Sequence, residues 1–165
     1  MFALKPISHD SVAGALAKAE RYRLLNEPGE AESICRDILE IEPGNQQALI
    51  SLLLALTDHI GHDSRAFGEA LLIADRLESP YDRAYYAGIA WERRARARHR
   101  TGHSGHRYTY DWLIRALELF EKAESLRAPG NDDAVLRWNA CVRYLQCHKE
   151  LAPSDEEVPA SIVSE

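Results

Sequence analysis

Apolar residues recur along most of this chain with a period close to 3.6, the spacing of one face of an α-helix. In the stretch AESICRDILEI the face is formed by Ala31, Ile34, Cys35 and Ile38, and WLIRALELFEKAESL repeats the pattern at residues 112–126. Alternating β-branched runs bounded by hairpin dipeptides, the signature of strands, are nearly absent. The pattern predicts an all-α protein of about seven helices. We expect them at residues 10–26, 29–41, 45–60, 65–78, 81–100, 110–127 and 132–150.

The boundaries between these helices repeat. EIEPGNQQALI contains Pro43, Gly44 and Asn45, and SLRAPGNDDAVL contains the same motif at residues 129–131. A third boundary, RLESPYDRAYYA, keeps Pro80 without the Gly-Asn pair. Proline just beyond a helix cannot continue it, and a short polar residue can cap the next one. We therefore expect a helix stop followed at once by a helix start, with the new helix capped or led by Asn45, Asp82 and Asn131.

The spacing of these boundaries indicates repeated helical hairpins. Pro43, Pro80 and Pro129 are separated by 37 and then 49 residues. A helix-turn-helix unit of ~34 residues has the tetratricopeptide length, so each interval reads as one unit plus an insertion. The first unit carries Tyr22, Ala31, Cys35, Ile38 and Pro43, the second Leu52, Leu53, Leu56, Gly68 and Pro80, and the third Gly88, Trp91, Ala116, Phe120, Ala123 and Pro129.

With these motifs, residues 11–151 resemble the tetratricopeptide-repeat family, as three degenerate repeats and a capping helix. Cys35 and Ile38 depart from the aromatic residue and the alanine usual at those positions. The resemblance implies a right-handed solenoid of helical hairpins whose concave face, lined by the first helix of each pair, binds a protein or peptide. The residues expected near that face are Glu20, Arg23, Ile50, Leu54, Tyr85, Glu92, Arg93, Leu136, Arg143 and Tyr144.

Some relatives of this fold clamp the carboxylate end of a chaperone tail with paired lysine and asparagine residues. The expected first helix of the second pair, QQALISLLLALTD, has no Lys, Arg or Asn, which argues against such a clamp. Its apolar character favours an apolar peptide or helix as partner, or self-association into a homo-oligomer.

Histidines gather in the two expected insertions, DHIGHDSR and RHRTGHSGHRYTYD. We expect both insertions to form enlarged inter-helix turns on one edge of the solenoid, the second leading into a helix near Asp111. Histidine binds zinc, nickel and copper, so a metal-binding or metal-sensing protein is the alternative function. A polar turn or a pH-sensitive edge is the competing interpretation. The candidate ligands are His59, His62, His99, His103 and His106, with Asp58 and Asp63 nearby.

The segment WERRARARHR places five arginines between Arg93 and Arg100. It is either an anion-binding patch, with Tyr108, Tyr110 and Trp112 as stacking partners, or a solvated helix end whose cations complement the helix dipole. The second interpretation is favoured, because arginines spaced by two and three residues do not share one face.

Composition narrows the function further. The formal net charge of −6 makes nucleic acid an improbable partner. Three cysteines without a CxxC pair fit a reducing, cytoplasmic location, and no apolar stretch is long enough for a membrane span. Catalytic motifs are missing, so no enzymatic activity and no obligatory cofactor are expected. Residues 1–10 read as a leader and residues 152–165 as an acidic, disordered tail.

Overall fold

The computed structural model describes residues 2–60, 65–102 and 106–153 of the 165-residue chain. This part of the chain is all-helical, without a strand, and the helices confirm the predicted all-α class. Its seven α-helices are α1 (Val12–Leu24), α2 (Pro28–Ile41), α3 (Gln46–His59), α4 (Ala66–Asp75), α5 (Pro80–Arg100), α6 (His106–Leu126) and α7 (Asp133–Cys147). Two 3₁₀ turns, η1 (His9–Ser11) and η2 (Lys149–Leu151), flank them.

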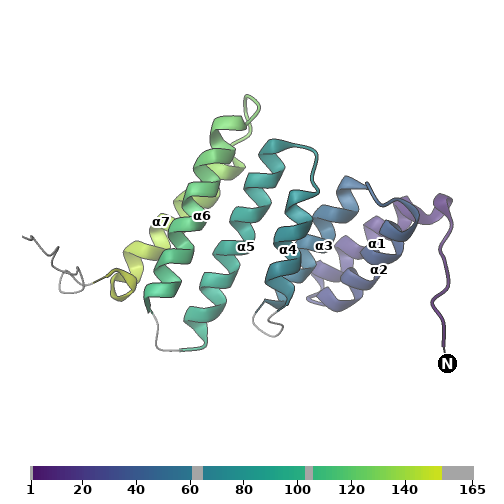
Figure 1. Cartoon of the computed structure of the whole chain (residues 1–165), viewed down its shortest axis with the longest axis horizontal. Helices are drawn as coiled ribbons and strands as arrows, with labels where there is room; N and C mark the ends of the chain where they lie inside the picture. Colours follow the sequence, from purple (N-terminus) through teal and green to yellow (C-terminus); the bar gives the residue numbers. More distant parts are fainter. Residues whose placement is uncertain (1, 61–64, 103–105, 154–165) are drawn as a thin grey trace, which may run out of the picture.

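The helices stand side by side along the long axis of the molecule, in chain order (Figure 1). Each helix packs against the next one in sequence, and short connections make successive helices run in alternating directions. The odd-numbered helices also touch one another, since α1 contacts α3 and α3 contacts α5. The odd-numbered helices therefore run parallel, so their C-terminal ends lie on the same edge of the row.

Capping residues at the repeated boundaries explain where the helices begin. The side chain of Asn45 accepts a hydrogen bond of 2.9 Å from the backbone N–H of Ala48, which confirms the predicted cap of α3. Asn131 accepts one of 3.0 Å from the N–H of Asp133, the first residue of α7. At the third boundary Ser79 supplies the cap, because its side chain accepts from the N–H of Asp82 in the first turn of α5. A capped N-terminus satisfies backbone donors that have no partner within the helix.

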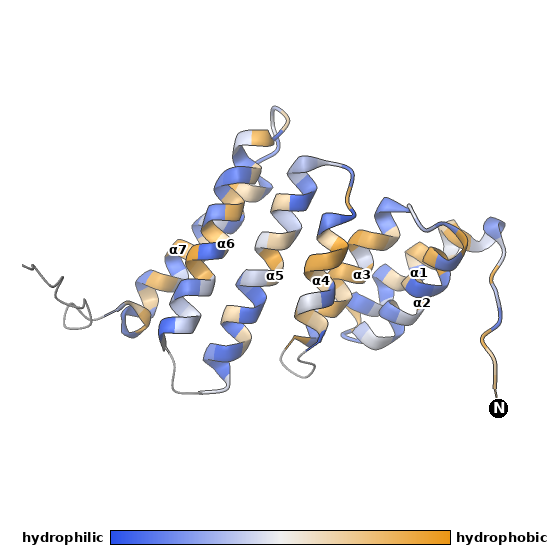
Figure 2. Ribbon diagram, in the orientation of Figure 1, coloured by the Kyte–Doolittle hydropathy of each residue, from blue (hydrophilic) through white to orange (hydrophobic). Residues whose placement is uncertain are grey.

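The core forms where the apolar faces of neighbouring helices meet, and hydrophobic residues are most concentrated in α3 and α4 (Figure 2). One apolar cluster spans α1 to α5 and another spans α5 to α7, with Trp91 and Tyr86 packed against both. Ala31 and Ala116 are fully buried, and small residues at such positions let neighbouring helices approach closely. None of the described helices is both long and apolar enough to cross a membrane.

The third hairpin differs from the sequence prediction. Helix α6 begins at His106, about one turn before the predicted residue 110, so most of the segment 98–112 is helical. Gly102 reverses the chain in the left-handed region with a φ of +65°, directly after α5 ends at Arg100. Both helices of this hairpin have 21 residues, so extra residues of the hairpin lengthen its helices.

Gly88 is required where α5 crosses α6. A Cβ atom at this position would lie 2.6 Å from Cε1 of Phe120, whose side chain is fully buried. We predict that Gly88→Ala lowers the free energy of unfolding by about 1–3 kcal/mol, because overpacking outweighs the gain in helix propensity. Urea denaturation measures the change. Gly68→Ala in α4 is the matched control: no atom lies within 4 Å of the added Cβ, so this variant should be equally or more stable than the wild type.

The thiols should differ sharply in reactivity. Cys35 and Cys141 are buried, and burial raises the pKa of the first to about 11 and of the second to about 12, whereas Cys147 is exposed. Only the thiolate is nucleophilic, so at pH 8 the two buried thiols stay neutral as well as shielded. We predict that one equivalent of Ellman's reagent reacts quickly with the native protein and all three thiols react in denaturant. Rapid labelling of two thiols in the folded protein would contradict this assignment.

Candidate binding groove

A groove of about 470 Å³ runs between α1 and α3. Four of the predicted binding residues line it together: Glu20 and Arg23 from α1, and Ile50 and Leu54 from α3. Leu16 adds a further apolar side chain, and the remainder of the wall is small or polar and consists of Ala13, Ala17, Gln47 and Ser51. The structure thus brings the predicted residues of the first two odd-numbered helices onto one surface.

Asp58, near the end of α3, joins the helices on either side. One carboxylate oxygen accepts from Nε of Arg23 at 3.2 Å, and the other pairs with Nη1 of Arg93. The same Nη1 also donates to the carbonyl of Leu54 at 3.2 Å and to Oγ1 of Thr57 at 2.6 Å. Burial lowers the pKa of Arg93 and the Asp58 carboxylate opposes that effect. Arg93, predicted as a binding residue, is therefore committed largely to contacts within the protein.

Next to this ion pair lies a second, positively charged hollow of about 380 Å³, which we call the arginine pocket. Four arginines and a single carboxylate line it, and Arg23 belongs to both the groove and the pocket. The pocket is formed by Arg23, Asn26, Thr57, Asp58, Arg93, Arg96, Ala97 and Arg100.

The arginine run of α5 divides between two faces of the helix. Arg93, Arg96 and Arg100 face the pocket. Arg94 lies on the other side, where its guanidinium carbon is 4.0 Å from the ring centre of Phe67 and 4.1 Å from that of Trp112. Arg98 stacks over Tyr108 at 5.3 Å. Tyr108 and Trp112, considered as stacking partners for a ligand, are thus in contact with the protein's own arginines.

Two predicted binding residues of α5 pack against other helices, and one of them is buried. Glu92 is 3% exposed, and its carboxylate pairs with Arg96 at 2.9 Å and with Arg137 of α7 at 3.4 Å. Its placement on an accessible face is therefore wrong, because the two arginines hold it between α5 and α7. Tyr85 is partly buried and packs against Phe120 with ring centres 6.1 Å apart. Both residues hold the helices together.

The three residues of α7 that were predicted to lie near the binding face occupy different environments. Leu136 and Arg143 are exposed, and neither lines the groove or the arginine pocket. Tyr144 is partly buried, with its hydroxyl hydrogen-bonded to Nδ1 of His99. The guanidinium carbon of Arg96 lies 4.4 Å from the centre of the Tyr144 ring. Tyr144 therefore joins α7 to the end of α5.

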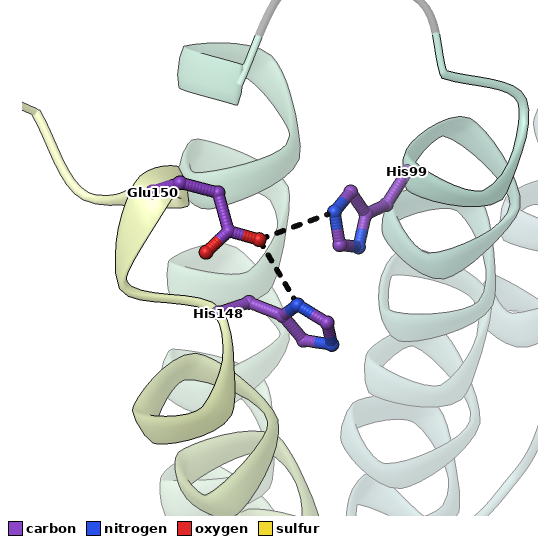
Figure 3. A group of neighbouring side chains, drawn as sticks. All are labelled: His99, His148 and Glu150. Atoms are coloured by element: carbon purple, nitrogen blue, oxygen red, sulfur yellow. Dashed lines mark hydrogen bonds and ion pairs between the residues drawn. The ribbon is translucent and has the colours of Figure 1, made fainter.

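His99 is the predicted metal ligand that the structure places in a cluster. It lies beside His148 and Glu150, and one potential ligand atom from each residue falls within 4.8 Å of the others (Figure 3). His59 ends α3 beside Gly29 and belongs to no such group among the described residues. His62, His103 and Asp63, and the side chain of His106, lie outside the described part of the chain.

Sequence reasoning missed His148 and Glu150 as partners of His99. A signal was available, because α5 and α7 are both odd-numbered helices and should end on the same edge. His99 precedes the last residue of α5 and His148 follows the last residue of α7, so a parallel arrangement brings the two imidazoles together.

Comparisons of this chain with protein-family models, with curated proteins and with solved structures found no match. The observations that bear on function are consequently the groove, the arginine pocket and the cluster around His99.

The buried carboxylate of Glu92 offers a test of this arrangement. Replacing it with glutamine removes the charge that neutralises Arg96 and Arg137. We predict that Glu92→Gln lowers the free energy of unfolding by about 1–3 kcal/mol, because partly buried guanidinium groups lose their ionic partner. Chemical denaturation measures the loss. Glu118→Gln, which removes an exposed partner of Arg115, is the control and should change stability by less than ~0.5 kcal/mol. Equal losses of stability in Glu92→Gln and Glu118→Gln would show that the buried ion pairs of Glu92 do not stabilise the contact between α5 and α7.

Proposed function

We propose that this protein is a non-catalytic scaffold of tetratricopeptide-type hairpins that binds a peptide segment of another protein in the groove. The observation that carries the proposal is that the two hollows are adjacent, since Arg23 lines both the groove and the arginine pocket. One extended ligand can therefore contact apolar side chains of α1 and α3 at one end and guanidinium groups of α5 at the other.

The residues that line the two hollows indicate which kind of peptide would bind. Leu16, Ile50 and Leu54 give the groove an apolar wall suited to aliphatic or aromatic side chains. The arginine pocket carries more positive charge than Asp58 neutralises, and guanidinium groups bind carboxylates with directed hydrogen bonds. The favoured ligand is therefore an acidic peptide that also presents a hydrophobic residue.

The side chains of the pocket differ in how much binding they can supply. Arg93 and Arg23 already share Asp58, so a ligand would have to compete with an existing ion pair. Arg100 is exposed in the last turn of α5, and its charge faces the pocket. Arg100 is therefore the residue whose reversal should affect an acidic ligand most and the fold least.

We predict binding of fluorescein-labelled decapeptide pools that combine leucine with aspartate and glutamate. Fluorescence anisotropy at low ionic strength measures the affinity. Matched pools with asparagine and glutamine in place of the acids should bind at least ~10-fold more weakly, because charge-assisted hydrogen bonds to arginine are lost. Raising the salt concentration should weaken the acidic pool more than the amide pool.

Two variants test the two hollows separately. Arg100→Glu should reduce affinity for the acidic pool at least ~10-fold, with Arg115→Glu on α6 as the charge control. Ala17→Trp should obstruct the groove, because Ala17 is an exposed residue of its wall, with Leu72→Trp at an exposed position of α4 as the size control. Equal affinity of all four variants for the acidic pool, or no binding to any pool, would refute the proposed function.

A further inference from the structure

The C-terminal ends of α5 and α7 meet at a cluster of three metal-ligating side chains. His99 comes from the last turn of α5, His148 follows α7, and Glu150 lies in η2 (Figure 3). Nδ1 of His148 lies 3.0 Å from Oε1 of Glu150, and Nε2 of His99 lies 3.7 Å from the same oxygen. We propose that His99, His148 and Glu150 bind a divalent cation of the zinc class.

The spacing of the donor atoms suits such an ion. Ligand atoms ~2.1 Å from a tetrahedral zinc ion lie ~3.4 Å from one another. The two separations that involve Glu150 fall on either side of this value, at 3.0 Å and 3.7 Å. The third separation, between the two imidazole donors, is no more than 4.8 Å, so side-chain rotations would have to close this gap around one ion.

The donor set also selects the class of metal. Two imidazoles and a carboxylate favour zinc, nickel, cobalt or copper over magnesium and calcium, which prefer oxygen ligands. Side-chain exposure rises from 20% at His99 to 36% at His148 and 51% at Glu150. His99 therefore lies at the buried end of the cluster and Glu150 at the end open to solvent, where water can complete the coordination.

Tyr144 orients His99 for this role. Its hydroxyl is hydrogen-bonded to Nδ1, which leaves Nε2 on the side of Glu150. A metal-bound imidazole commonly donates its other N–H to an oxygen atom, and this contact fixes the ring and its tautomer.

The backbone contributes a favourable field. Helix α5 ends at Arg100 and α7 ends at Cys147, so the negative ends of two helix dipoles point to the region of the cluster. Arg100 and Arg96 act against a cation there, but Arg96 is already paired with the buried carboxylate of Glu92. A bound ion would fasten the end of α7 and η2 to α5, beside the arginine pocket.

Calorimetric titration of the metal-stripped, full-length protein with zinc chloride tests the site, with magnesium chloride as the negative control. We expect one equivalent of zinc and negligible magnesium binding. His148→Gln and Glu150→Gln should each weaken zinc binding at least ~10-fold, because each removes one of three ligands. Cobalt titration adds a second readout, since a tetrahedral site with nitrogen donors gives intense visible bands that both variants should lose.

The double variant His103→Gln/His106→Gln separates this site from one built on the histidines of the α5–α6 connection. It should bind zinc like the wild type. Circular dichroism melting confirms that each variant is folded, and Glu150 is exposed enough for its replacement to leave the fold intact. No zinc binding by the wild type, unchanged binding by His148→Gln and Glu150→Gln, or a loss confined to the double variant would overturn the proposal. Peptide affinity is measured separately, so failure of either proposal leaves the other standing.

Discussion

The carboxylate of Asp58 sets the geometry on which the groove depends. It lies at the end of α3 and holds Arg23 of α1 on one side and Arg93 of α5 on the other. Three parallel helices are thereby linked through one charged group, in addition to their apolar contacts. Burial penalises the guanidinium of Arg93, and the penalty is offset because Leu54, Thr57 and Asp58 all accept hydrogen bonds from it. Removal of Asp58 would leave Arg23 and Arg93 to repel each other in the arginine pocket.

The helical order of the chain follows from features that are local in sequence. Proline ends a helix and asparagine starts the next one within three residues, so Asn45 and Asn131 could be assigned before any tertiary contact was considered. The start of α6 escaped prediction because two glycines suggested a long break. Gly102, with its positive φ, reverses the chain soon after α5, and the helix resumes at His106.

The surface of the groove could be predicted only where the helix register was fixed locally. The boundary at Asn45 sets the register of α3, and in that register Ile50 and Leu54 both line the groove. Glu92 was misplaced because one of its two ionic partners is Arg137, which is 45 residues away in sequence. The cluster of His99, His148 and Glu150 likewise depends on two helix ends that only the tertiary arrangement brings together. Periodicity identifies which face of a helix is buried, but not which polar residues find a partner on another helix.

The overall charge of the protein and the charge of its pocket have opposite signs, and this contrast bears on how a ligand is selected. The chain carries a formal net charge of −6, which repels an acidic peptide at long range. At physiological ionic strength this repulsion decays over ~8 Å, so the arginines dominate only after the ligand has entered the pocket. Their field is itself reduced, because Arg96 and Arg100 lie in the last turns of α5, whose dipole is negative at that end. In the proposed binding mode, charge alone would therefore give modest affinity, and apolar contacts with Ile50 and Leu54 would supply a substantial share of the binding free energy. In the proposed binding mode, a ligand that satisfies only one of the two hollows should dissociate quickly, so the distance between its acidic and hydrophobic groups would determine specificity.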